Sequence, residues 1–130
     1  YYTKVRRALQ AANWKRLRFS GKNAILIRKK GAMAMLQHVV LFKLKPEYME
    51  EIPQLVQGFL NMRGKIDGLE ELYAGADILK SERSYDLGLV CVFRDRAAFD
   101  AYQTHPVHQP VRKKMHEGRL SSVSCDFELD

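Results

Sequence analysis

A tyrosine and two histidines lie close together in the segment Tyr102-Gln103-Thr104-His105-Pro106-Val107-His108. A neutral imidazole, whose ordinary pKa is about 6.5, can accept a proton at neutral pH. A tyrosine hydroxyl can donate a hydrogen bond to an oxygen that gains negative charge. Pro106 fixes the backbone between the two imidazoles. The segment therefore indicates acid–base chemistry, although His105 can also simply end a helix and Tyr102 can be a core aromatic residue.

A third histidine, His38, alternates with Val40 and Phe42 and is predicted to point toward a packed face. Such a histidine is either a hydrogen-bonded core residue or part of a cavity between a sheet and its helices. His105 and His108 have a spacing that can chelate a metal, but no cysteine, HExxH or Glu-x-x-His pattern supplies further ligands. We therefore predict no metal ion and no organic cofactor.

Other kinds of site have no sequence signal. No glycine-rich phosphate loop, nucleophile elbow or dinucleotide fingerprint occurs in the sequence. Cys91 and Cys125 are too few for a disulfide scaffold, and each lies in a strand-like run where a free cysteine behaves as a small buried hydrophobe. We expect a reducing, cytoplasmic setting.

The charge is distributed unevenly along the 130 residues, whose net charge is +7. Residues 1–34 contain ten Lys or Arg and no Asp or Glu, whereas residues 35–130 contain twelve against fifteen. Nucleic-acid binding is therefore expected only through residues 1–34, where Tyr2–Phe19 could form a basic amphipathic helix. These residues are either an artificial leader, as Gly31-Ala32-Met33-Ala34 suggests, or a natural extension. No apolar run approaches the roughly 20 residues of a membrane-spanning helix, so no membrane partner is expected.

From residue 35 onward, apolar residues follow regular strand and helix spacings. The predicted strands are Leu36–Lys43, Leu69–Leu79 with a break near Gly75, Tyr85–Phe93, and a final strand in which Val123, Cys125, Phe127 and Leu129 form one dry face. The predicted helices are Ile52–Gly64, Arg96–Gln103 with Asp95 as its N-cap, and Val107–Glu117. The order β-α-β-β-α-α-β predicts an α+β fold, a four-stranded antiparallel sheet with helices on one face. The first and third strands are too apolar for the other face to be solvated, which predicts a homodimeric α/β barrel.

Four ordered segments of residues 35–130 resemble the stress-responsive A/B barrel (Dabb) family. They are Gln37-His38-Val39-Val40-Leu41-Phe42-Lys43-Leu44-Lys45, Ser84-Tyr85-Asp86-Leu87-Gly88-Leu89-Val90, Ala98-Phe99-Asp100-Ala101-Tyr102-Gln103-Thr104-His105-Pro106-Val107-His108 and Asp126-Phe127-Glu128. The resemblance implies a ferredoxin-like protomer and a homodimer that forms the barrel.

The resemblance also implies a candidate site. In a plant polyketide cyclase of the family, which closes a linear chain by an aldol condensation without a cofactor, the matching residues make His108 the general base. His38 and Tyr102 would then orient the base or hydrogen-bond the substrate oxygen. Phe59 stands near a pocket tyrosine of the cyclase, and we predict that it binds substrate together with His105 and Tyr85. Two alternatives stay open: a stress-associated structural or interaction dimer, and cofactor-free oxygenation of the kind found in related dimeric barrels.

Overall fold

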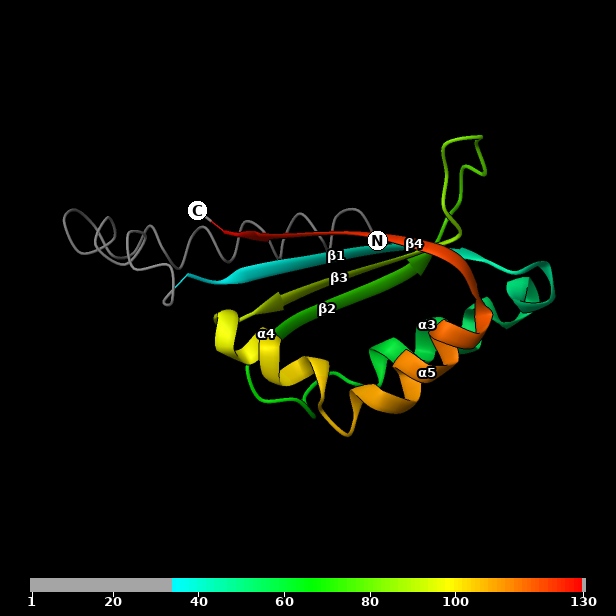
Figure 1. Cartoon of the computed structure of the whole chain (residues 1–130). Helices are drawn as coiled ribbons and strands as arrows, with labels where there is room; N and C mark the ends of the chain where they lie inside the picture. Colours follow the sequence, from blue (N-terminus) through cyan, green and yellow to red (C-terminus); the bar gives the residue numbers. More distant parts are fainter. Residues whose placement is uncertain (1–33, 130) are drawn as a thin grey trace.

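The structure is a computed structural model that describes residues 34–129. The predicted helix over Tyr2–Phe19 and the interpretation of the basic N-terminal segment lie outside these residues. Figure 1 shows a sheet of four strands with the helices gathered on one of its faces. In chain order the elements are β1 (Leu36–Leu44), the 3-10 helix η2 (Pro46–Glu51), α3 (Ile52–Leu60), β2 (Leu69–Ala76), β3 (Leu87–Phe93), α4 (Arg96–Gln103), α5 (His108–Gly118) and β4 (Arg119–Glu128).

The sheet order is β2-β3-β1-β4, and all three strand pairs are antiparallel. β1 is a central strand, which pairs with β3 along one edge and with β4 along the other. In its register His38 lies opposite Cys91 of β3 and opposite Asp126 of β4. The predicted α+β fold with four antiparallel strands is confirmed.

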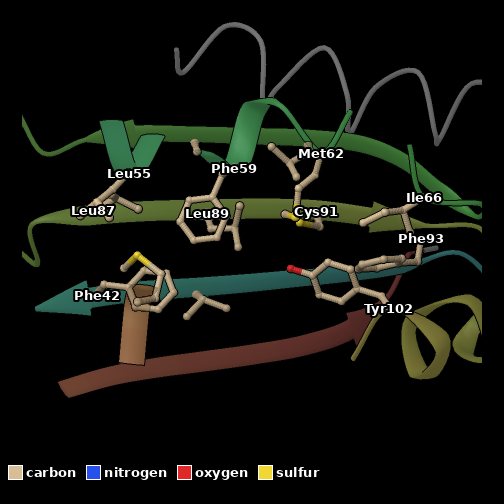
Figure 2. Packing of buried hydrophobic residues seen from close by; sticks show 14 of the residues in the cluster. Phe42, Leu55, Phe59, Met62, Ile66, Leu87, Leu89, Cys91, Phe93 and Tyr102 are labelled. Atoms are coloured by element: carbon tan, nitrogen blue, oxygen red, sulfur yellow. The ribbon is translucent and has the colours of Figure 1, made fainter. Parts of the chain in front are cut away.

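The helix face of the sheet holds the core. Because side chains alternate along a strand, His38, Val40 and Phe42 of β1 all face the helices. Figure 2 shows what covers this face of the sheet. Leu55 and Phe59 of α3, Met62 and Ile66 of the turns after α3, and Tyr102 of α4 pack against Leu87, Leu89, Cys91 and Phe93 of β3. Cys91 is fully buried, as predicted, and burial raises the pKa of its thiol, which keeps it protonated.

The N-cap of α4 is confirmed. The Asp95 side chain accepts a hydrogen bond of 2.8 Å from the backbone N–H of Ala98, which satisfies one of the unpaired amides of the first turn. α4 has the bounds predicted for it. The following turn, which contains Pro106, leads directly into α5, whose first residue is His108.

Several predicted element ends are wrong. α3 ends at Leu60 because the chain then tightens into shorter-range turns and passes through Gly64, whose φ is +74°. β2 runs without a break through Gly75, which pairs with Gly88, and ends at Ala76. Its irregularity lies between Leu69 and Glu71 instead.

The two hairpin strands are shorter than predicted, because β3 begins at Leu87 and the chain between the strands forms a long loop. Ile78 and Leu79 lie in that loop with 88% and 80% of their surface exposed. The loop projects away from the helix side of the sheet (Figure 1). β4, by contrast, begins at Arg119, four residues before the predicted start at Val123. Residues 119–122 have no alternating apolar pattern, but they pair with β1 and so extend the strand.

One face of the sheet is covered by no helix of the described residues, and this helix-free face is apolar and exposed. Leu41 of β1 lies opposite Val123 of β4, and the two are 38% and 47% exposed, with Phe127 at 43%. The prediction of a dry face on the last strand is therefore wrong for a single protomer, and Cys125 is exposed rather than buried. The physical reason is that the helices within residues 34–129 all lie on the opposite face. Only Leu129 of the predicted set is buried.

Candidate active site

A cavity of about 250 Å³ lies between α5 and the sheet. Its wall is built from β1, β3, β4 and the three α-helices, so it depends on the packing of these helices on the sheet. It is lined by His38, Val40, Phe42, Phe59, Leu89, Tyr102, His108, Arg112, Met115, His116, Arg119, Ser122 and Ser124. The cavity is smaller than typical sites for drug-sized ligands, which begin at about 300 Å³.

His108 is the first residue of α5 and is 7% exposed. Its Nδ1 lies 3.0 Å from the carbonyl oxygen of Tyr102. Because a carbonyl can only accept, Nδ1 carries the proton, and Nε2 of the neutral ring is left with its lone pair. Burial lowers the pKa of His108 below 6.5, and the nearby charge of Arg112 lowers it further. His108 is therefore a neutral imidazole at pH 7, the form that a general base requires.

Tyr102 lies between the two histidines. Its ring stacks on His108 at a centroid distance of 3.9 Å, and His38 approaches it at 6.2 Å in an edge orientation. The side chain is 1% exposed, and burial raises the pKa of the phenol. No other described residue hydrogen-bonds its hydroxyl, which Figure 2 shows directed toward Phe42, Phe59 and Leu89. Tyr102 thus offers a protonated hydroxyl to a ligand in the cavity.

His38 is held by Asp126, which lies directly opposite it on β4. Nδ1 of His38 hydrogen-bonds the Asp126 carboxylate. Since an ionised carboxylate only accepts, this bond fixes the proton on Nδ1 and leaves Nε2 for a ligand. Asp126 is not among the residues predicted from the sequence. Only the register between β1 and β4 identifies it, because this register places Asp126 opposite His38. Its chain neighbours Cys125 and Phe127 point to the other face of the sheet.

The structure brings four of the six predicted site residues together at this cavity: His38, Phe59, Tyr102 and His108. Phe59 stacks on Phe42 at 5.9 Å and forms part of the apolar wall.

The other two predicted residues do not line the cavity. His105 lies in the turn before α5, where its Nδ1 accepts a hydrogen bond of 3.1 Å from the Val107 backbone. Its own carbonyl accepts from the N–H groups of His108 and Gln109, so its contacts stabilise the start of α5. Tyr85 lines a different hollow, beside the β2–β3 loop and Leu41.

Within residues 34–129, no group of three or more His, Cys, Asp or Glu side chains is placed to hold a metal ion. The same part of the chain contains no helix with the length and apolar character needed to cross a bilayer.

Comparison with known proteins identifies the family. A model of the stress-responsive A/B barrel domain matches residues 36–129. The chain belongs to the stress-responsive A/B barrel (Dabb) family. This confirms the resemblance, and the matched residues contain His38, Tyr102 and His108 of the cavity. No curated protein gives a significant match to the chain.

Solved structures of similar fold confirm the ferredoxin-like architecture of this Dabb chain. A dimeric ferredoxin-like protein of unknown function from Jannaschia is 27% identical, with a TM-score of 0.62 over 72% of this chain and 98% of that one. A dimeric protein of unknown function from Bacteroides fragilis is 24% identical, with a TM-score of 0.66 over 72% and 95%. A hydroxynitrile lyase from Passiflora edulis is 14% identical, with a TM-score of 0.66 over 75% and 95%.

Proposed function

We propose that this Dabb protein is a homodimer that binds a small organic molecule and catalyses a cofactor-free proton transfer next to a carbonyl, as in an aldol-type cyclisation. One observation carries the proposal. The buried, neutral His108 stacks on Tyr102, whose hydroxyl has no protein partner among the described residues, and both line one cavity. A base and a hydrogen-bond donor side by side are what enolate formation requires.

The chemistry follows from the atoms that are left open. Nε2 of His108 takes a proton from the carbon beside the substrate carbonyl. The electron pair of that C–H bond forms the C=C bond of the enolate, and the π pair of the C=O bond moves onto the oxygen. The Tyr102 hydroxyl donates a hydrogen bond to this oxygen as it gains charge. The enolate carbon then attacks a second carbonyl of the same molecule, and His108 returns its proton to the new alkoxide. Asp126 holds the His38 ring in place throughout.

The fold is compatible with enzymatic activity, because the hydroxynitrile lyase from Passiflora edulis has the same architecture. The alternative function, a structural or interaction dimer without catalysis, requires that the imidazoles be closed to ligands. The open cavity beside His38 and His108 favours the first function.

The homodimer is supported by the exposed helix-free face. Leu41, Val123 and Phe127 form an apolar surface there, of the kind that marks an interface. Several neighbours of the same fold are dimeric. A cytoplasmic location and a role in stress responses belong to the same proposal, the first supported by the two free cysteines.

The test is an NMR titration of the imidazole ¹⁵N signals with methyl 7-oxooctanoate, a neutral ketone, as the probe. We expect the His108 signal to move with the probe, and the protons beside the ketone to exchange with D₂O faster than in His108→Gln. Lys113→Gln, on the exposed side of the same helix, is the control and should exchange at the wild-type rate. If the imidazole ¹⁵N signals do not shift when the probe is added and the exchange rate equals that of His108→Gln, the protein is a structural dimer instead.

A further inference from the structure

The cavity has two chemically different ends. Along β1, His38 lies at one end and Phe42 at the other, about 13 Å apart at the usual strand rise. Along α5, His108 lies at the first end, and His116 follows two turns later, about 12 Å along the axis. Ser122 of β4 lies opposite Phe42 of β1. His116, Phe42 and Ser122 therefore line the second end of the cavity.

Arg119 organises the second end. One terminal nitrogen of its guanidinium donates to the Ser122 hydroxyl oxygen, and the other lies 3.1 Å from Nδ1 of His116. Because arginine can only donate, Nδ1 of His116 is the acceptor, and the proton of that neutral ring is on Nε2. The Ser122 hydroxyl likewise accepts from arginine and keeps its own O–H free to donate.

The groups left for a ligand at this end are therefore chiefly hydrogen-bond donors. The Arg119 guanidinium uses two of its five N–H groups in the bonds above, and three remain. Arg112 adds a second positive charge between this end and His108. Neither guanidinium forms an ion pair with a carboxylate in the part of the chain that the structure describes, whereas Arg94 and Arg96 do.

This cluster of unpaired positive charge is unusual for the domain, because residues 35–130 have more acidic than basic residues. The field of Arg112 reaches the other end of the cavity, because it partly offsets the burial that raises the pKa of Tyr102 and adds to the burial that lowers the pKa of His108. A bound anion would neutralise this charge in a partly desolvated position, where charge-assisted hydrogen bonds are strong.

We propose that Arg119, Ser122 and His116 bind a carboxylate, and that the substrates are small oxo-carboxylic acids. The carboxylate lies at this end, the apolar chain along Val40 and Met115, and the ketone beside Tyr102 and His108. The inference rests on the proposed function, because it places the reacting carbonyl at those residues.

The test compares binding of 7-oxooctanoate with binding of its methyl ester, which has the same chain and ketone but no charge. Dissociation constants come from ¹H–¹⁵N NMR titrations of the full chain. We expect the acid to bind at least about tenfold more tightly than the ester, as one or two charge-assisted hydrogen bonds provide. Arg119→Gln should remove this preference and leave the affinity for the ester unchanged.

Two further variants keep the test decisive. Ser122→Ala removes one donor with little change in volume and should weaken binding of the acid alone, even if Arg119→Gln fails to fold. Lys113→Gln removes the same charge from an exposed position on α5 and should keep the full preference for the acid.

Four results would overturn the inference: no binding of the acid, equal binding of acid and ester, an equal loss in Lys113→Gln and Arg119→Gln, or displacement of the acid by equimolar inorganic phosphate. The outcome is separate from that of the proposed function. An acid preference without deuterium exchange would refute only the catalytic proposal, and His108-dependent exchange of the ester without an acid preference would refute only the carboxylate site.

Discussion

Replacing His108 by glutamine should change how the stability of the protein depends on pH. In the folded state, burial lowers the pKa of His108 below the value of about 6.5 that the residue has in the unfolded chain. Above that pH, the imidazole is neutral in both states and contributes no pH dependence. As the pH falls through 6.5, the His108 imidazole binds a proton in the unfolded state but stays neutral in the folded state. The wild-type protein therefore loses stability relative to His108→Gln.

The size of this effect has a fixed upper limit. One proton contributes at most about 1.4 kcal/mol of unfolding free energy per pH unit, and the loss ends where the folded-state pKa is reached. The pKa is lowered by burial first, and Arg112 is a secondary cause. In an Arg112→Gln background the wild-type loss should therefore become smaller, but it should not disappear.

The assay is urea denaturation followed by circular dichroism at several pH values between about 5.5 and 7.5, at one protein concentration. The difference between the wild-type and His108→Gln curves cancels the contributions of all other titrating groups. We expect this difference to be constant above about pH 7 and to decrease toward acid pH. A flat difference, or a wild-type protein that gains stability over the variant in acid, would show that the ring is not held neutral.

Three other predictions concern the turn, the interface and the hydroxyl. Gly68 has φ +82° and an added Cβ would lie 2.4 Å from the Ala98 Cβ, so Gly68→Ala should lower the free energy of unfolding in urea by about 3 kcal/mol. Gly64 has φ +74° but open space around it, so Gly64→Ala should lower it by about 1 kcal/mol. Equal losses in the two variants would contradict the packing argument. Leu41→Glu should convert a dimer into a monomer in light scattering, and an unchanged mass would show that the dimer does not use this face. Tyr102→Phe should slow deuterium exchange at least about tenfold, with a change in stability below about 1 kcal/mol, because the hydroxyl has no partner among the described residues; exchange at the wild-type rate would remove Tyr102 from the mechanism.

The order and type of the elements could be predicted from local patterns. α4 is the clearest case, because a capping aspartate and two aromatic residues three positions apart define a short helix on their own. Element ends were less predictable because they depend on pairing between distant segments. Gly75 is a local strand breaker, yet it stays in β2 because Gly88 of β3 pairs with it. Arg119–Ser122 has no strand pattern, yet β1 holds it in β4.

The candidate site could be predicted in part for the same reason. His38, Tyr102 and His108 stand out by residue type within patterned elements, and the fold brings all three to one cavity. Asp126 could not be singled out, because its importance comes from lying opposite His38 in the sheet. Tyr85 could not be placed correctly, because the predicted strand included it whereas β3 begins at Leu87. Tyr85 lies in the β2–β3 loop, away from the cavity.

The pairing of β1 with β4 links the two ends of the cavity. It places Asp126 opposite His38 and, four residues back along β4, Ser122 opposite Phe42. A shift of one residue in this register would turn both Asp126 and Ser122 to the helix-free face, because strand side chains alternate with a period of two. The imidazole of His38 would lose the carboxylate that orients it, and Arg119 would lose an acceptor. The acid–base end and the cationic end therefore depend on the same set of backbone hydrogen bonds.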